Sequence, residues 1–128
     1  MEKNSDIQFR SPEEIKLYQE ARLTETLAYL QAHSRFYQQM FKEHSIDITR
    51  IKKIEDLQQI PVTTKTDLQL HNSEFICVDP DGIIDYVTTS GTLGDPVTFV
   101  LTSKDLDRLA YNEYLSFNTA GCSRHDIL

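Results

Sequence analysis

Glycines, hydroxyl side chains and a proline lie close together in the stretch TTSGTLGDPV, between two runs rich in Val, Ile, Tyr, Phe and Thr. Gly91 and Gly94 tolerate positive φ, which lets successive backbone N–H groups point into one concavity and solvate an anion. The hydroxyls of Ser90 and Thr92 would add donors, and Pro96 would stiffen the exit of the loop. From composition, two interpretations stay open: a phosphate-binding loop and a solvated hairpin loop.

Two common phosphate motifs do not fit this loop. The Walker motif needs G-x-x-x-x-G-K-[ST] leading into a helix. Here Pro96 stands five places after Gly91, no Lys follows, and a β-rich run comes next. The dinucleotide motif G-x-G-x-x-G fails because Gly91 and Gly94 are the only glycines of the stretch. What remains is a strand, a loop centred on S-G-T-x-G-x-P, and a second strand.

Composition excludes several classes of protein. The 128 residues are enough for one domain with its own core. A net charge of −7 argues against nucleic acid as a partner, since binding it needs a basic face. The sequence shows neither a signal-peptide pattern nor an apolar run of membrane-spanning length. We therefore expect a cytoplasmic protein without a membrane partner, with Cys77 and Cys122 reduced and no metal site.

Helices and strands must position the loop. Ser11, Pro12 and Glu14 predict a helix start, Ser34 begins a second helix, and Thr64 with Asp67 caps a third. Strands follow in IIDYVTT and VTFVLT. A final helix is predicted to start at a cap formed by Thr102 and Asp105 and to end at Gly121. Its inward apolar stripe would consist of Leu106, Leu109, Ala110, Tyr114 and Phe117. The last residues, RHDIL, are predicted to start a strand.

The loop resembles the phosphate-binding loop of the adenylate-forming superfamily, whose usual form is S/T-S-G-T-T-G-x-P. Upstream, LQAHSRFYQQMFKEHSID at 30–47 and IKKIEDLQQIPVTTKTDL at 51–68 resemble the N-terminal region of phenylacetate-CoA ligases. In that group an x-H-S-x-F-Y helix precedes a D-L-x-x-I-P-x-T-x-K-x-D-L segment. The resemblance covers about residues 15–128, in the same order and spacing.

The resemblance implies an α/β fold, of which this fragment would be an α+β part. Residues 1–82 would form a helical N-terminal region of the adenylation domain, and residues 83–128 the truncated start of its α/β core, with the hairpin loop. It also implies a carboxylate that reacts with ATP and Mg²⁺ to give an acyl-adenylate and pyrophosphate, and coenzyme A that then displaces AMP. The residues that would hold the ATP phosphates are Thr89, Ser90, Gly91, Thr92 and Gly94.

The chain departs from the family pattern in two ways. Leu93 replaces the usual second Thr, and Asp95 places a negative charge near the expected phosphate site. The family's aromatic-G-x-T-E segment, ribose-binding Asp and C-terminal Lys have no counterpart here. We therefore expect no catalytic residue in this fragment. By itself the chain is expected to be inactive, to bind nucleotide weakly at best, and to self-associate through unpaired strand edges.

The acyl or aryl carboxylate is not specified by these residues. The leading hypothesis is the N-terminal fragment of a phenylacetate-CoA ligase-like enzyme. One alternative is a coenzyme F390 synthetase-like or acyl-protein synthetase-like adenylating enzyme. Another, from a different class, is a non-catalytic module that binds a nucleotide or a partner.

Overall fold

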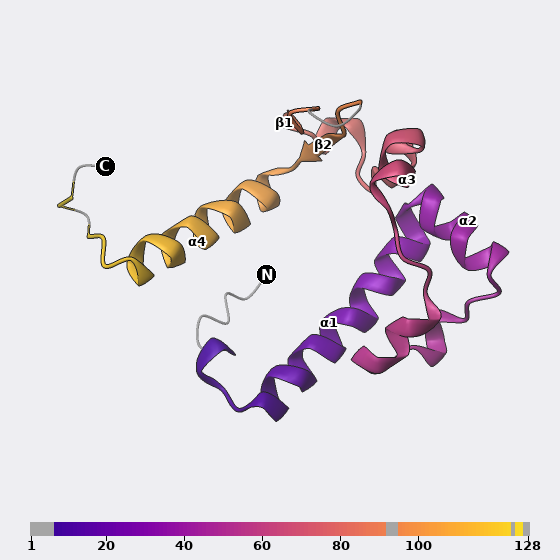
Figure 1. Cartoon of the computed structure of the whole chain (residues 1–128), viewed down its shortest axis with the longest axis horizontal. Coiled ribbons are helices and arrows are strands. Elements are labelled where there is room, and N and C mark those ends of the chain that lie inside the picture. The colour runs from indigo at the N-terminus through magenta and orange to yellow at the C-terminus, as the bar shows by residue number, and fades with distance from the viewer. Residues whose placement is uncertain (1–6, 92–94, 124, 127–128) are drawn as a thin grey trace. The chain divides into compact units, whose positions relative to one another are not determined.

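The computed structural model describes residues 7–91, 95–123, 125 and 126 (Figure 1). The chain divides into two compact units, Met1–Cys77 and Val78–Leu128. The expected assignment of residues 1–82 and 83–128 to parts of an adenylation domain stays a prediction.

The first unit is helical, and the second contains the hairpin. In the first unit the elements are η1 (Ile7–Phe9), α1 (Pro12–His33), α2 (Arg35–Glu43), η2 (Ile48–Arg50), η3 (Ile54–Gln59), α3 (Lys65–Leu70) and η4 (Asn72–Phe75), where η marks a 3₁₀-helix. In the second unit they are η5 (Pro80–Gly82), β1 (Asp85–Thr88), β2 (Thr98–Leu101) and α4 (Ser103–Thr119). Helices together with an antiparallel strand pair confirm the predicted α+β class.

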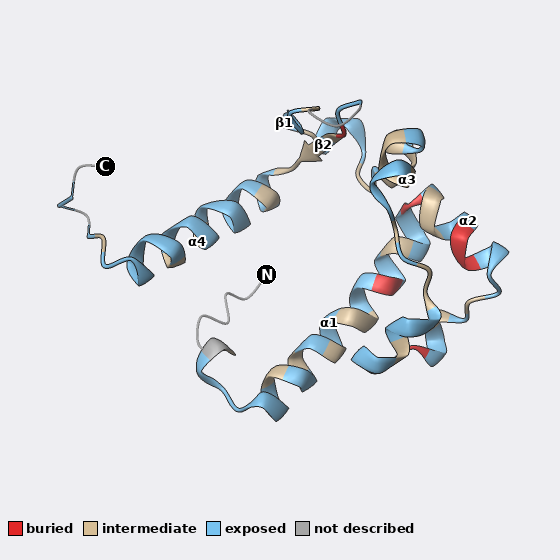
Figure 2. Cartoon of the chain, in the orientation of Figure 1, coloured by how far each residue is buried: buried red, intermediate tan, exposed pale blue. Residues whose placement is uncertain are grey.

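The core of the first unit lies between α1, α2 and the segment after η2. Leu27, Phe41 and Ile51 are buried there and form one cluster. Figure 2 shows buried positions in red on both α1 and α2. Half-buried apolar side chains surround them: Leu23, Tyr37, Ile46, Ile48 and Ile60. Because α1 and α2 are separated only by Ser34, they pack closely and bury their facing sides.

Long-range hydrogen bonds hold the later segments of the first unit against α1 and α2. Ser34 is completely buried; its hydroxyl donates to the Glu74 carbonyl at 3.1 Å and accepts from the Tyr37 N–H at 3.3 Å. The Tyr29 hydroxyl donates to the Cys77 carbonyl at 2.9 Å. Because the Ser34 hydroxyl both donates and accepts a hydrogen bond, its burial does not carry the free-energy cost of an unpaired polar group.

The predicted helix starts are confirmed. Capping boxes form at the N-termini of α1, α3 and α4, where Ser11, Thr64 and Thr102 each exchange hydrogen bonds with the acidic residue three positions on. In each box the hydroxyl accepts an N–H that the helix cannot satisfy, and the carboxylate accepts the N–H of the capping residue. Local sequence is therefore sufficient to fix where these helices begin.

Two helices end in a residue with left-handed backbone conformation. Gly121, at φ 81°, follows α4, and the Cys122 N–H donates to the Phe117 carbonyl at 2.9 Å. At the end of α2 the corresponding residue is Ser45, at φ 52°, and the Ile46 N–H donates to the Phe41 carbonyl at 2.8 Å. Both ends form the same motif, but one of them uses a residue with a Cβ atom.

One expectation for α4 is wrong. Its apolar stripe, predicted to face a core, is exposed: Leu106 is 41% exposed and Phe117 is 43% exposed. The physical reason is that the second unit offers α4 only a short hairpin, which is too small to cover a helix of 17 residues.

The expected strand at RHDIL falls partly outside the described residues. Within the described part the chain turns, because the Asp126 N–H donates to the Ser123 carbonyl at 3.2 Å.

Candidate functional site

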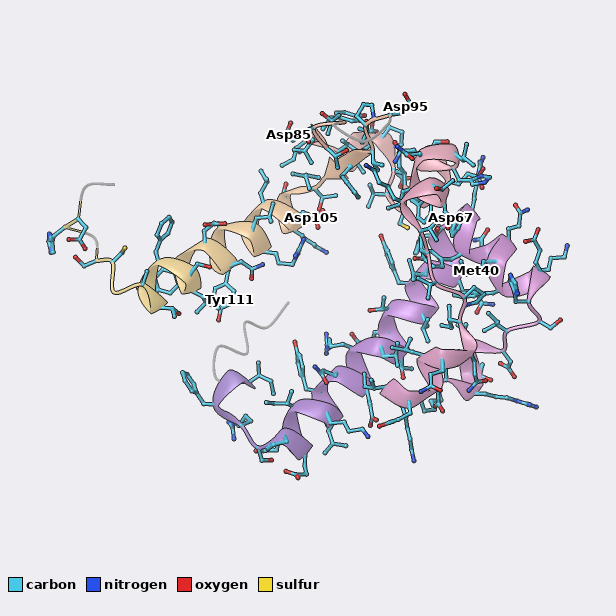
Figure 3. The ribbon with its side chains drawn as sticks, in the orientation of Figure 1. Met40, Asp67, Asp85, Asp95, Asp105 and Tyr111 are labelled. Atoms are coloured by element: carbon cyan, nitrogen blue, oxygen red, sulfur yellow. The ribbon has the colours of Figure 1, made fainter. Side chains whose placement is uncertain are left out.

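The hairpin presents the loop that the sequence singles out. Strands β1 and β2 pair antiparallel, with Asp85 opposite Leu101 and Thr88 opposite Thr98. Asp85 and Asp95 are labelled on this part of the chain in Figure 3. Val and Thr in both strands favour the extended conformation, which explains why they form here. The predicted strand–loop–strand order is confirmed.

The pairing continues for one residue beyond each strand. The Thr89 N–H donates to the Val97 carbonyl at 3.0 Å. In return, the Val97 N–H donates to the Thr89 hydroxyl oxygen at 3.0 Å. We call Thr89 and Val97 the neck of the loop, which then spans residues 90–96.

Two predicted phosphate ligands lie directly after the neck. Ser90 is exposed, and Gly91 has φ 66°. A left-handed residue is one half of the backbone arrangement in which successive N–H groups converge on an anion. For Gly91 the sequence therefore predicted the backbone conformation correctly. Thr92 and Gly94 lie outside the described residues, as does Leu93.

Asp95 places a negative charge beside the loop, where it is exposed on the exit side. Asp105 lies beyond the opposite end of β2, in the first turn of α4, where hydrogen bonds from the backbone N–H and the hydroxyl of Thr102 lower the pKa of its carboxyl group. Asp105 is therefore ionised at neutral pH, with its Oδ2 engaged in the cap.

The described residues contain no group of three or more His, Cys, Asp or Glu side chains that could hold a metal ion. Cys77 and Cys122 are both free thiols. Burial raises the pKa of the Cys77 thiol, which makes it less nucleophilic at neutral pH. None of the helices described here is long and apolar enough to cross a membrane.

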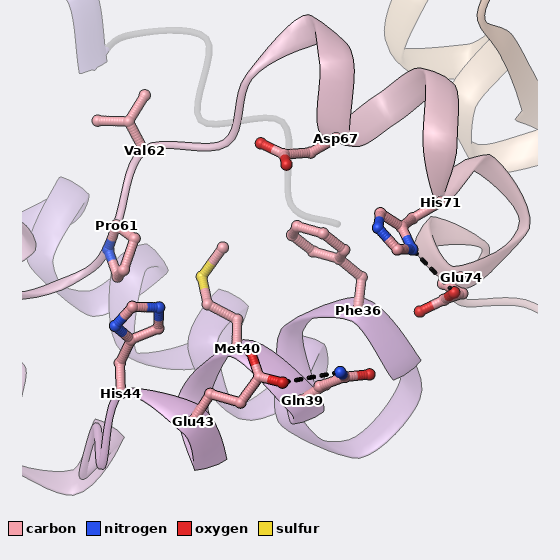
Figure 4. A pocket seen from close by; sticks show the side chains of 10 residues that line it. All are labelled: Phe36, Gln39, Met40, Glu43, His44, Pro61, Val62, Asp67, His71 and Glu74. Atoms are coloured by element: carbon pink, nitrogen blue, oxygen red, sulfur yellow. Dashed lines mark hydrogen bonds and ion pairs between the residues drawn. The ribbon is translucent and has the colours of Figure 1, made fainter.

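The first unit has a pocket of about 270 Å³ beside α2 and α3 (Figure 4). Its lining residues are Phe36, Gln39, Met40, Glu43, His44, Pro61, Val62, Asp67, His71 and Glu74.

The acidic side chains of this pocket already have partners within the wall. Glu43 accepts from Gln39 at 2.8 Å, Glu74 pairs with the His71 ring at 3.1 Å, and Asp67 caps α3. These groups stabilise the helices around them, so we assign the pocket no ligand.

No protein-family model matches the chain. A phenylacetate-coenzyme A ligase of Thermus thermophilus is 32% identical over 110 residues, which are 85% of this chain and 25% of the relative. The phenylacetate-coenzyme A ligase of Escherichia coli is 29% identical over 122 residues, 94% of this chain and 28% of the relative.

A similar solved structure is also that of a CoA ligase. The crystal structure of 2-hydroxyisobutyryl-CoA ligase in complex with 2-HIB-AMP and CoA in the thioesterification state aligns with a TM-score of 0.77 and 25% identity, over 84% of this chain and 24% of that chain. The resemblance to the adenylate-forming superfamily is confirmed. The chain spans about a quarter of the length of the curated relatives it matches.

Sequence reasoning missed the part played by Val97. It is 2% exposed, the lowest exposure among the described residues of the hairpin, and its N–H is held by a side chain rather than by the opposite strand's carbonyl. The only sequence signal is a Thr placed directly before the S-G of the loop, eight residues from a Val that follows a Pro.

Proposed function

We propose that this chain is the N-terminal part of the adenylation domain of an ATP-dependent, AMP-forming acyl- or aryl-CoA ligase. The observation that carries the proposal is the loop itself. A hairpin presents S-G-T-x-G-x-P, with Gly91 left-handed, in a chain that is 32% identical to a phenylacetate-coenzyme A ligase. In this role the chain supplies the phosphate-binding loop, and residues elsewhere in the protein supply the acyl pocket.

The loop residues bind and position; they do not react. Ser90, Gly91, Thr92 and Gly94 hold the β- and γ-phosphates of ATP, and Thr89 assists from the neck. ATP would supply the adenylyl group: the carboxylate oxygen bonds to the α-phosphorus, the bond from the α-phosphorus to the bridging oxygen breaks, and pyrophosphate leaves. Donors fixed in place before the reaction stabilise charge on the departing pyrophosphate without having to reorganise. We propose no catalytic acid, base or nucleophile within these residues.

The loop suits a nucleotide phosphate. Ser90 is exposed, and Gly91 adopts the left-handed conformation that forms one half of an anion-binding backbone arrangement. Mg²⁺ is implied by ATP, but no described cluster would hold it without the nucleotide. Coenzyme A is the thiol acceptor by analogy with the 2-hydroxyisobutyryl-CoA ligase, whose structure contains CoA and an adenylate. We place the protein in the cytoplasm, where these substrates occur and thiols stay reduced.

The chain alone is proposed to be inactive and to self-associate. The exposed apolar side chains of α4 and of the hairpin, including Tyr86, Phe99 and Leu106, are the surface through which copies would meet. Sedimentation equilibrium of the chain is expected to show dimers or larger species, and a monomer at high concentration would contradict this part.

A non-catalytic binding module is the second candidate. The exposed Asp95 beside the loop favours it, because a carboxylate there weakens phosphate binding. A coenzyme F390 synthetase-like or acyl-protein synthetase-like enzyme would use the same loop with another acceptor.

The test is carboxylate-dependent exchange of pyrophosphate into ATP by the complete protein that contains this chain. Phenylacetate and 2-hydroxyisobutyrate are the first carboxylates to assay, followed by CoA-dependent release of AMP. Ser90→Ala is expected to reduce exchange about 10-fold or more, because one phosphate donor is lost. Ser103→Ala, at the exposed first residue of α4, is the matched control. ATP binding without exchange for any carboxylate would favour the binding module.

A further inference from the structure

At the neck of the loop a side chain stands where a regular antiparallel pair uses the main chain. At each hydrogen-bonded position of such a pair, the two opposite residues exchange both N–H···O=C bonds. Thr89 and Val97 are opposite each other in the register that β1 and β2 define. The Thr89 N–H reaches the Val97 carbonyl as expected, but the returning N–H of Val97 is accepted by the Thr89 hydroxyl.

This exchange has a geometric consequence. Because the acceptor is on the side chain, the Thr89 carbonyl is not needed by the ladder, and the main chain can turn away directly after Thr89. Two residues later Gly91 is already left-handed. On the exit side Pro96 has no N–H to offer, so Val97 provides the first donor of the returning strand.

Burial makes the Val97 donor important. Val97 is 2% exposed, and a buried N–H without an acceptor is costly. The hydroxyl of Thr89 satisfies it, because its oxygen lies 3.0 Å from the Val97 nitrogen.

We propose that Thr89 is a positioning residue, whose hydroxyl holds the Val97 N–H at the neck so that Ser90 and Gly91, directly after it, leave the ladder in a conformation that receives a nucleotide phosphate. The inference rests on the proposed function for its ligand. It assigns Thr89 an indirect role, through Val97, rather than a contact with the phosphate.

The test uses three variants of the complete protein: Thr89→Val, Thr89→Ser and Thr88→Val. Valine keeps the shape of threonine without the acceptor, and serine keeps the acceptor. Thr88 is the neighbouring exposed threonine at the end of β1 and is the matched control. For each variant, hydrogen exchange by mass spectrometry is followed at the Val97 amide without nucleotide, and KM for ATP and kcat are measured by pyrophosphate exchange.

The expected result is specific to Thr89→Val. Its Val97 amide exchanges about 5- to 100-fold faster, and its KM for ATP rises by a similar factor with a smaller change in kcat, because Ser90 and Gly91 must be held in place before ATP binds. Thr89→Ser and Thr88→Val keep values within about 3-fold of the wild type.

Each contrary result has a distinct meaning. Val97 exchange unchanged in Thr89→Val would overturn the positioning role. A raised KM with unchanged exchange would also overturn it, in favour of a direct contact between Thr89 and phosphate. A wild-type protein without nucleotide turnover would overturn the proposed function and the nucleotide part of this inference, and the exchange data would still decide whether Thr89 holds the neck.

Discussion

The two compact units differ in what stabilises them. In Met1–Cys77, residues from separate helices share a core of Leu27, Phe41 and Ile51, and long-range hydrogen bonds close over it. In the described part of Val78–Leu128, Val97 is the one buried residue, and the apolar stripe of α4 is exposed. The first unit therefore has a core of its own that holds its helices together, whereas the second has well-formed helices and strands but little core.

A helix can therefore have well-defined ends even when its apolar face is not buried. Helix α4 has a complete capping box at Thr102 and a left-handed glycine at its end, so its boundaries need no tertiary partner. Its apolar face needs one. If the chain works as part of a larger ligase, further chain supplies that partner, and the exposed stripe becomes an internal surface of the whole protein.

The largest expected effect tests the core of the first unit. Leu27→Ala removes a side chain that is 4% exposed and is expected to reduce the free energy of unfolding of that unit by about 2–4 kcal/mol. Leu106→Ala, the matched change in α4, is expected to change the free energy of unfolding of the first unit by no more than about 0.5 kcal/mol. Urea titration followed by circular dichroism measures both. Equal losses would mean that the two units share one core. Ile51→Val, expected to cost about 1 kcal/mol, keeps the test valid if Leu27→Ala does not fold.

The next effect concerns the buried hydroxyl of the first unit. Ser34→Ala removes the cap of α2 and leaves the Glu74 carbonyl without its donor, so it is expected to destabilise the unit by about 1–3 kcal/mol. Ser11→Ala removes an exposed cap at α1 and is expected to cost about 1 kcal/mol. Thermal unfolding compares the two. A smaller loss for Ser34→Ala than for Ser11→Ala would show that its burial adds nothing.

A reciprocal pair compares the two helix ends. Ser45→Gly is expected to stabilise the first unit by about 0.5–1 kcal/mol, because glycine adopts positive φ without the Cβ penalty. Gly121→Ser is expected to destabilise the end of α4 by a similar amount. Among the described residues, none beyond the two neighbours of Gly121 would contact a Cβ atom there, so the expected cost comes from backbone strain. Chemical denaturation tests Ser45→Gly, and amide exchange near Cys122 tests Gly121→Ser. A change of the same sign in both would contradict the shared motif.

The smallest expected effect is acid sensitivity at the capping boxes. Hydrogen bonds from Thr64 lower the pKa of the Asp67 carboxyl group, and those from Thr102 lower the pKa of Asp105. A carboxyl group whose pKa is lower in the folded state contributes stability above its unfolded pKa, about 3.9, and that stability is lost as the pH falls through the folded pKa. Helix signals of α3 and α4 are therefore expected to weaken below about pH 4.

The acid titration has a built-in control. Asp67→Asn and Asp105→Asn each remove one titrating cap and should flatten the pH dependence of their own helix while leaving the other unchanged. NMR chemical shifts of the Asp67 and Asp105 amides follow the two caps separately. A variant that flattens both curves would show that the helices unfold together.

Much of the fold could be predicted from the sequence because the signals are short-range. A capping residue and its partner are three positions apart, as in Thr64 with Asp67, and the hairpin strands follow from their β-branched residues. The likeness to phenylacetate-CoA ligases also rests on contiguous motifs, and the comparisons confirm it. For the loop, the left-handed Gly91 was predictable, whereas the phosphate-binding roles stay a proposal.

Other features depend on residues that the sequence cannot bring together by pattern alone. The buried contact of Ser34 with Glu74 joins positions 40 residues apart, and nothing about an isolated Ser signals it. The stripe of α4 has the spacing of a buried face and yet is exposed, because burial depends on what lies opposite and not on periodicity. The sequence by itself determined where the helices and strands begin and that Gly91 can take a left-handed conformation, because those are local properties of the backbone. Only the tertiary structure decided that the Thr89 hydroxyl is engaged by Val97, because that contact requires two strands in register.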